Sequence, residues 1–230
     1  MGTGAIFLFG VTGGGSGGTS ATNLIIDADV QDYNVLTTST ALGYDNSSGA
    51  NITITVTIDS GVNVTASALG GTAFTTGALN ANTTVRIINN GNIQGNNGAS
   101  GAAGSTGGSG GKGIFFNTLT GGTATHSLEN NGTVSGGGGG GGGGGRRETC
   151  EDDGDGGQEC GAPVAEGNSG AVGALGESGQ PGANPSAQGI CACPLSPSAG
   201  SGGSGGDSID KNGRTVSQSG TGTYNGTQRA

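Results

Sequence analysis

Apolar and polar residues alternate strictly in several stretches of the first third of the chain. The clearest stretch, NITITVTI at 51–58, places four apolar residues on one face and three threonines on the other, which is the period of a half-buried strand. A turn at 59–61 separates it from a second alternating stretch at 62–66, and together they predict a hairpin. Further strands are predicted at 23–27, 33–37 and 83–88. Because no stretch shows the period of a helix, an all-β domain is predicted, and no α-helix is expected in the chain.

Glycine recurs with a period of three in the second half of the chain. It accounts for 57 of the 230 residues and occupies every third position at 95–113 and at 167–182, with ten consecutive glycines at 136–145. A strict phase of three is typical of an extended left-handed helix of the polyproline II type, whereas a flexible linker requires no phase. Collagen shares this period but relies on proline, and the chain has only five prolines.

These runs predict a bundle of polyglycine II helices. Such helices have no internal hydrogen bonds, so the backbone amides of one helix are expected to bond to the carbonyls of its neighbours. A run of 16 to 19 residues would be roughly 50–60 Å long at about 3.1 Å per residue. A shorter run with glycine at 200, 203 and 206 ends the pattern.

A short motif precedes two of the glycine runs. Ile87 to Gly91 (IINNG) recurs as Leu128 to Gly132 (LENNG), and a weaker copy, IDKNG, begins at Ile209. The first two copies continue through a few residues directly into a glycine run. Each copy is predicted to form a short strand, an Asn-Gly turn, a second short strand and then a polyglycine helix.

Charge and motifs argue against several classes of function. Only 10% of the residues are charged and the formal net charge is −9, so nucleic acid is not an expected partner. No apolar run approaches the roughly 20 residues that span a bilayer, and Met1 to Gly10 lacks a basic region, so neither membrane insertion nor a signal peptide is expected. His126 is the only histidine, and neither a nucleophile elbow nor a phosphate-binding loop is present. The chain is therefore predicted to be non-enzymatic and to need no cofactor.

Chemistry is expected in the loops between glycine runs, because a glycine lattice is chemically inert. The loop at 146–166 gathers the charged residues that we take as candidates for binding: Arg146, Arg147, Glu151, Asp152, Asp153, Asp155 and Glu159. A second loop is predicted at 183–199. The acidic residues do not follow the spacing of a calcium loop, so no metal site is predicted.

The four cysteines lie in these two loops. Their spacing, C-x9-C for Cys150 and Cys160 and C-x-C for Cys191 and Cys193, does not match a zinc ribbon or finger. A disulfide between Cys150 and Cys160 is the candidate, with a bond between the two loops as the rival and free thiols as a third possibility. If successive glycine runs are antiparallel, the two loops would lie at opposite ends, which disfavours the rival.

The β-rich start, the phrase IINNGNIQG at 87–95 and the G-x-x triplets interrupted by loops resemble glycine-rich tail proteins of tailed bacteriophages. The second half, about 85–206, is similar to the tip adhesins of T-even-type long tail fibres. In those adhesins, packed polyglycine II helices lie behind hypervariable loops that touch the bacterial outer surface. The first 85 residues look more like glycine-rich tail proteins in which a β domain precedes the glycine lattice.

This resemblance implies a tail-tip or tail-fibre adhesin of the virion that recognises the bacterial host surface. The implied partners are other phage tail proteins and a host surface glycan or outer-membrane protein. A purely structural tail component and a bacterial collagen-like matrix adhesin are the alternatives.

Four parts are expected along the chain. They are a tail-docking segment or linker at 1–20, the all-β domain at 21–94, the polyglycine II domain with its two loops at 95–206, and a strand and turn segment at 207–230. Because the β part has few large apolar residues, a single copy is expected to be marginally stable. A homo-oligomer is therefore expected, with a trimer favoured by analogy with tail fibres.

Overall fold

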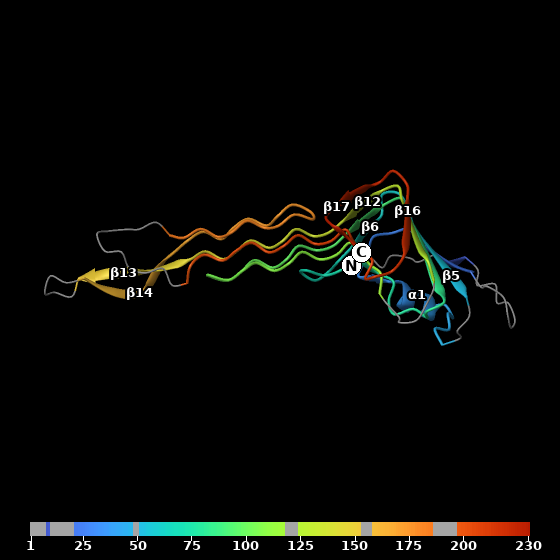
Figure 1. Ribbon diagram of the computed structural model, residues 1–230, viewed down its shortest axis with the longest axis horizontal. Helices are drawn as coiled ribbons and strands as arrows, with labels where there is room; N and C mark the ends of the chain where they lie inside the picture. The colour runs from blue at the N-terminus through green and yellow to red at the C-terminus, as the bar shows by residue number, and fades with distance from the viewer. Residues whose placement is uncertain (1–7, 10–20, 48–50, 118–123, 153–157, 186–196) are drawn as a thin grey trace.

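The computed structural model describes residues 8–9, 21–47, 51–117, 124–152, 158–185 and 197–230. Strands are stacked at one end of the molecule, and long extended segments run from this stack to the opposite end (Figure 1). Among the described residues, no helix is long and apolar enough to cross a membrane.

The stack consists of three sheets. The first has the order β1 (Leu8–Phe9), β2 (Ala21–Ile26), β5 (Ile52–Ile58), β8 (Thr83–Asn89), β11 (His126–Asn130) and β16 (Val216–Ser219). The second has β3 (Val30–Gln31), β6 (Asn63–Thr65), β9 (Asn92–Gln94), β12 (Thr133–Ser135) and β17 (Thr223–Asn225). The third has β4 (Tyr33–Asn34), β7 (Phe74–Thr75), β10 (Ile114–Phe115), β15 (Ile209–Asp210) and β18 (Gln228–Arg229).

The chain visits the three sheets in turn and forms five stacked coils. The strands β2, β3 and β4 form the first coil, and β16, β17 and β18 form the last. Neighbouring coils pair in parallel in all three sheets, and only β1 lies antiparallel to its neighbour β2. The all-β character of the stack is thus confirmed, and strands beyond 21–94 contribute to every sheet.

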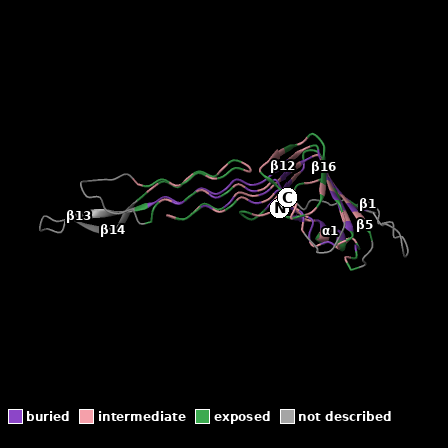
Figure 2. Ribbon diagram, in the orientation of Figure 1, coloured by how far each residue is buried: buried purple, intermediate pink, exposed green. Residues whose placement is uncertain are grey.

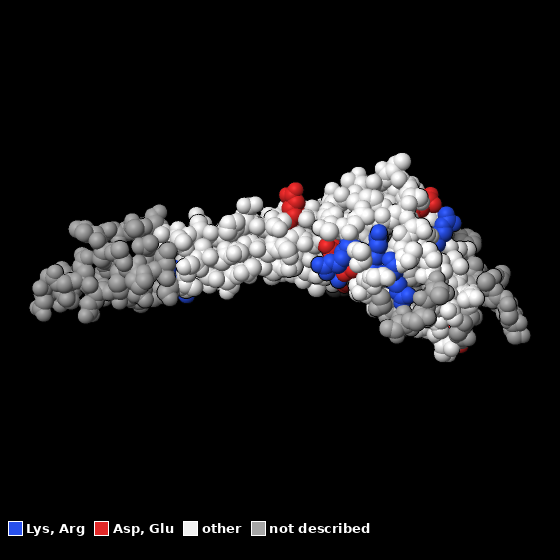
Figure 3. Space-filling view, viewed as in Figure 1, with Lys and Arg blue, Asp and Glu red and all other residues white. Residues whose placement is uncertain are grey.

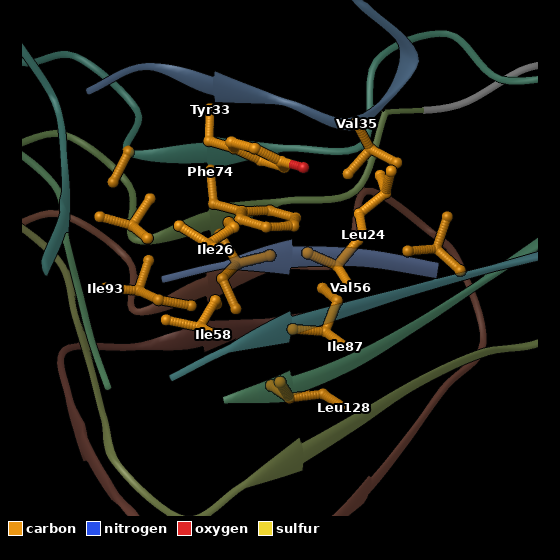
Figure 4. Close-up of a cluster of buried hydrophobic side chains, with 14 of the residues drawn as sticks. Leu24, Ile26, Tyr33, Val35, Val56, Ile58, Phe74, Ile87, Ile93 and Leu128 are labelled. Atoms are coloured by element: carbon orange, nitrogen blue, oxygen red, sulfur yellow. The ribbon is translucent and has the colours of Figure 1, made fainter. Parts of the chain in front are cut away.

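The core lies inside the coils. Leu24, Val56, Ile87 and Leu128 occupy equivalent register positions on successive strands of the first sheet, and none is more than 1% exposed (Figure 4). The alternating stretch at 51–58 therefore forms a strand as predicted, and its apolar face points into the core. On the third sheet, the ring of Tyr33 stacks on Phe74 with 5.3 Å between the centroids.

The predicted hairpin at 51–66 is wrong. Strand β5 pairs with β2 and β8, whereas β6 lies in the second sheet and pairs with β3 and β9. The turn after β5 changes the direction of the chain at a corner of the coil and does not reverse it. Alternation shows only that a strand has one buried face. Both β5 and β6 have such a face, because each faces the same core from a different sheet.

The expectation of no α-helix is also wrong. Only Tyr33–Asn34 of the stretch at 33–37 is a strand, and helix α1 (Val35–Ala41) follows it. The Asn34 side chain caps the helix by accepting a hydrogen bond from the N–H of Thr37 at 3.2 Å. Val35 and Ser39, one helical turn apart, are its buried residues. Its threonines favour strands, so the sequence pattern concealed the helix.

The repeated motif forms the two short strands and the Asn-Gly turn predicted for its first two copies. Strands β8 and β9, like β11 and β12, flank an Asn-Gly turn and lead directly into a glycine run. The copy at Ile209 is not equivalent, because β15 belongs to the third sheet and pairs with β10. It shares only the Asn-Gly sequence, because Asn212 and Gly213 have positive φ whereas the Asn-Gly pairs of the first two copies do not.

Two buried asparagines connect successive coils where the first sheet turns into the second. The Asn89 amide donates to Asn130 Oδ1 at 2.8 Å, and the Asn130 amide donates to the Thr223 carbonyl at 3.2 Å. We expect Asn130→Leu to lower the free energy of unfolding by about 2 kcal/mol, because the buried Asn89 amide loses one of its two acceptors and the Thr223 carbonyl loses a donor. Urea denaturation measures this loss. Asn131→Ala, at an exposed neighbour, is the control and should change stability by less than about 0.5 kcal/mol; an equal loss in both variants would contradict the prediction.

Candidate functional site

All the glycine-rich segments leave the stack at one corner, between the second and third sheets. The five coils cross this corner with very different lengths of chain, namely residue 32 and the ranges 66–73, 95–113, 136–208 and 226–227. The long connections contain six extended segments: segment I (95–102), segment II (105–113), segment III (136–145), segment IV (167–174), segment V (177–184) and segment VI (198–207).

Two of the glycine runs fold back on themselves. Segment I turns into segment II through a bond from the Ser105 N–H to the Ala102 carbonyl, and segment IV turns into segment V through a bond from Glu177 to Ala174. Each turn contains a glycine with φ near +70°, Gly104 in the first and Gly176 in the second. A single pass is therefore eight to ten residues, or about 25–30 Å at the rise of an extended threefold helix, so the expected length of 50–60 Å is wrong.

Segment III is the centre of the bundle, and all ten of its glycines are buried (Figure 2). Its carbonyls accept bonds of 2.7–2.8 Å from segments I, IV and VI: from Gly98 to Gly138, from Gly170 to Gly142, and from Gly203 to Gly140. Its amides donate bonds of 2.8 Å to segments II and V: from Gly140 to Gly108, and from Gly139 to Glu177. Five segments thus surround it through backbone hydrogen bonds.

Steric crowding explains why segment III is glycine throughout. A Cβ at Gly140 would lie closer than 3.0 Å to carbonyl oxygen of segment I, one at Gly141 equally close to segment IV, and one at Gly142 to segment VI. Segments II and VI, each beside three others, have two glycines in most triplets, and segments I and IV, each beside two others, have one. Segment V has one glycine in each triplet although it lies beside segments III, IV and VI. The number of glycines in a triplet therefore follows the number of neighbouring segments in five of the six segments, and segment V is the exception.

The register of the segments is inherited from the sheets. The N–H of Gly95 donates to the Ser135 carbonyl at 3.0 Å and continues the pairing of β9 with β12. The N–H of Gly113 donates to the Asp207 carbonyl at 3.0 Å and leads into the pairing of β10 with β15. The bundle thus extends two sheets of a rigid core.

Charged side chains gather where the bundle leaves the stack, and most of the shaft beyond is uncharged (Figure 3). Lys112 Nζ lies 2.7 Å from Asp210 Oδ2 and 4.2 Å from the centroid of the Phe115 ring. Asp210 is buried, so this ion pair ties segment II to β15 at the base of the bundle. The shaft offers few groups for polar recognition, which directs attention to its far end.

The far end carries a hairpin of β13 (Arg146–Asp152) and β14 (Gln158–Glu166). An exposed ion pair of 2.8 Å joins Arg146 to Glu166 at its base. The N–H of Arg146 also donates to the Pro197 carbonyl at 2.9 Å. Both loops therefore lie at the same end, and the expectation that they lie at opposite ends is wrong. Two passes, segments IV and V, separate them, so the chain returns to the far end.

The structure places the predicted site residues unevenly. The backbones of Arg146, Arg147, Cys150, Glu151, Asp152, Glu159 and Cys160 belong to the hairpin, whereas Asp153, Asp155, Cys191 and Cys193 lie outside the described residues. Their roles in binding remain predictions. Among the described residues, no three side chains gather that could hold a metal ion.

His126 is part of the core. Its Nδ1 accepts a hydrogen bond of 3.1 Å from the N–H of Val85, and its ring lies 5.4 Å from that of Phe116. Burial, reinforced by the positive charge of Arg214, lowers the pKa of His126 to about 4. The neutral ring thus accepts a hydrogen bond from the backbone of the neighbouring coil.

The chain is similar to known phage proteins. A model of the family described as phage tail fibre adhesin Gp38 matches residues 21–229. The chain belongs to the phage tail fibre adhesin Gp38 family. This adhesin is therefore a receptor-binding protein of the virion tail. A chain of the gp37-gp38 adhesin tip complex of the bacteriophage S16 long tail fiber is 17% identical, with a TM-score of 0.42 and coverage of 90% of this chain and 81% of that one. No curated protein matches the sequence.

Proposed function

We propose that the adhesin contacts the host with the far end of the glycine bundle, through the β13–β14 hairpin and the loop at 183–199. The observation that carries this proposal is the convergence of the bases of both loops at one end of a shaft that is mostly glycine, alanine and small polar residues. The hydrogen bond from Arg146 to Pro197 joins the bases of the two loops, which supports a joint role in contact with the host.

The six segments are, in this proposal, polyglycine II helices. Their bonds to neighbours recur every third residue, as at Gly137, Gly140 and Gly143, which all donate to segment II. This period is that of a helix with three residues per turn and no internal bonds. Because every pass is held on several sides by backbone bonds, the shaft keeps the tip loops in a fixed position relative to the stack.

The receptor is, in this proposal, a surface glycan or an outer-membrane protein. The hairpin carries charged groups that can recognise a hydroxyl-rich or polar surface: a positively charged hydrogen-bond donor and several negatively charged acceptors. They are Arg147, Glu151, Asp152 and Glu159, together with Asp153 and Asp155, which lie between the two strands in the sequence. Recognition of this kind needs no catalysis and no cofactor.

The strand stack is, in this proposal, the end that attaches to other tail fibre proteins. It lies opposite the tip and has its own core of apolar residues buried within a single chain (Figure 4). A trimer remains a prediction, and this core means that oligomerisation is not needed to bury the apolar residues of the stack.

A turn exchange tests the proposed tip. Residues 146–166 are replaced by Ala-Ala-Gly-Ser-Thr, the sequence of the reversal at 102–106, which leaves Gly145 and Gly167 joined as Gly101 and Gly107 are. We expect virions with this variant to assemble and to lose adsorption to host cells. The control inserts the same five residues in place of 174–178, at the reversal nearest the stack, and should adsorb normally. Normal adsorption without the hairpin would refute the proposed tip.

A further inference from the structure

Two cysteines face each other in the backbone register of the tip hairpin. Cys150 on β13 is the direct partner of Cys160 on β14. Direct partners in an antiparallel pair have Cα atoms about 4.5–5.5 Å apart, which lies inside the range of about 4.4–6.8 Å that a disulfide requires. A shift of one residue in either strand would remove this pairing.

We propose that Cys150 and Cys160 form a cross-strand disulfide that locks the hairpin after the virion leaves the reducing cytosol. The two thiols give up two electrons and two protons to an external disulfide such as oxidised glutathione, which is reduced to two thiols. One sulfur–sulfur bond forms in the protein and one breaks in the oxidant. Cytosolic thiols stay reduced, so the hairpin is assembled open and closes in oxidising surroundings.

The hairpin has two features that a covalent link would offset. Its register shifts between Arg147 and Glu148 and again between Glu148 and Cys150, so the ladder near the base is irregular. Beyond the cysteine pair, Glu151 is the direct partner of Glu159, and like charges at opposed positions destabilise a strand pair. A bond at the cysteine pair, next to this repulsion, holds the register on both sides.

The link is detected by a peptide map of the purified full-length adhesin without reduction. A protease that cleaves after Glu releases Cys150 in fragment 149–151, Cys160 in fragment 160–166, and both Cys191 and Cys193 in fragment 178–230. We expect 149–151 and 160–166 to be recovered as one species, lighter by two hydrogen atoms than their sum, after exposure to oxidised glutathione. Recovery of either fragment joined to 178–230, or of both with alkylated thiols, overturns the proposal.

The effect on adsorption rests on the proposed function and is measured separately. We expect reduction, or the pair Cys150→Ser and Cys160→Ser, to slow adsorption several-fold. The control pair Cys191→Ser and Cys193→Ser lies in the second proposed tip loop, so only its response to reductant is compared, and reduction should still slow its adsorption several-fold. If adsorption survives the turn exchange while the linked peptide is present, the proposed function fails and the disulfide stands. If the turn exchange abolishes adsorption and the linked peptide is absent, the disulfide alone fails.

Discussion

Gly140→Ala is expected to disrupt the glycine bundle while the strand stack stays folded. The added Cβ would fall closer than 3.0 Å to the carbonyl oxygen of Ala99, which is backbone and cannot turn aside. Gly140 also donates to Gly108 and accepts from Gly203, so it cannot move away from segment I without breaking a bond on another side. Overpacking of this kind costs about 3 kcal/mol or more where the surroundings cannot relax.

Hydrogen exchange measured segment by segment locates this loss. The amides of Gly98, Gly101, Gly200 and Gly203 should exchange faster in the variant, whereas those of β5 and β8 should keep their protection. Ser201→Ala is the matched control, because Ser201 lies on adjoining segment VI with its side chain exposed. Unchanged exchange in Gly140→Ala would show that segment III is not packed as closely as described.

Acid is expected to destabilise the strand stack through His126. The unfolded chain binds a proton on this ring near pH 6.5, whereas the folded protein binds it only near pH 4, because the ring is buried, lies near Arg214 and accepts the Val85 N–H. The unfolded state therefore holds more protons between these values. Stability is complete above about pH 6.5 and falls by about 3 kcal/mol as the pH decreases to 4.

His126→Asn isolates this effect. The asparagine Oδ1 can occupy the place of Nδ1 and accept the Val85 N–H, but it does not titrate. The variant is expected to be less stable at neutral pH, since Phe116 loses its ring contact, yet its unfolding midpoint in urea should change little between pH 6.5 and 5. Carboxylates that titrate near pH 4 affect both proteins, so the difference between the two pH profiles is the measurement. Parallel profiles would mean that His126 is not the group responsible.

The strands were predictable where one face is buried, and their partners were not. The alternation at 51–58 identifies β5 and its inward residues. Nothing in that pattern distinguishes a hairpin from a coil, because Val56 is equally buried in either arrangement. Helix α1 escaped prediction since its capping residue, Asn34, also suits a turn and its threonines suit a strand.

The glycine period revealed the extended segments but hid their reversals. Gly104 and Gly176 have the positive φ of a turn, and each also falls three residues after a glycine that faces segment III. Because the glycine at each turn keeps the spacing of three residues, two antiparallel segments read in the sequence as one continuous run. The Asn97 side chain, which accepts the N–H of Gly138 at 2.8 Å, was likewise invisible before its neighbour was known.

A usable signal was present in the number of glycines in each triplet. Ten consecutive glycines mark the segment that all the others surround, and pairs such as Gly202 and Gly203 mark segments beside three others. Single glycines mark segments I and IV, which lie beside two others, and also segment V, which lies beside three. Side chains are excluded wherever backbone approaches backbone, so the glycine content identifies the central segment, although it does not distinguish segment V from segments I and IV.

The sequence by itself determined the local features: which strand faces are buried, where extended glycine-rich segments run, and that the polar loops lie between them. Only the tertiary structure decided which strands pair and which loops meet. The pairing of β5 with β8 and the meeting of Arg146 with Pro197 join residues far apart in the chain. They depend on how often the chain reverses between them, and a reversal at Gly176 that keeps the glycine phase leaves no trace in the periodicity.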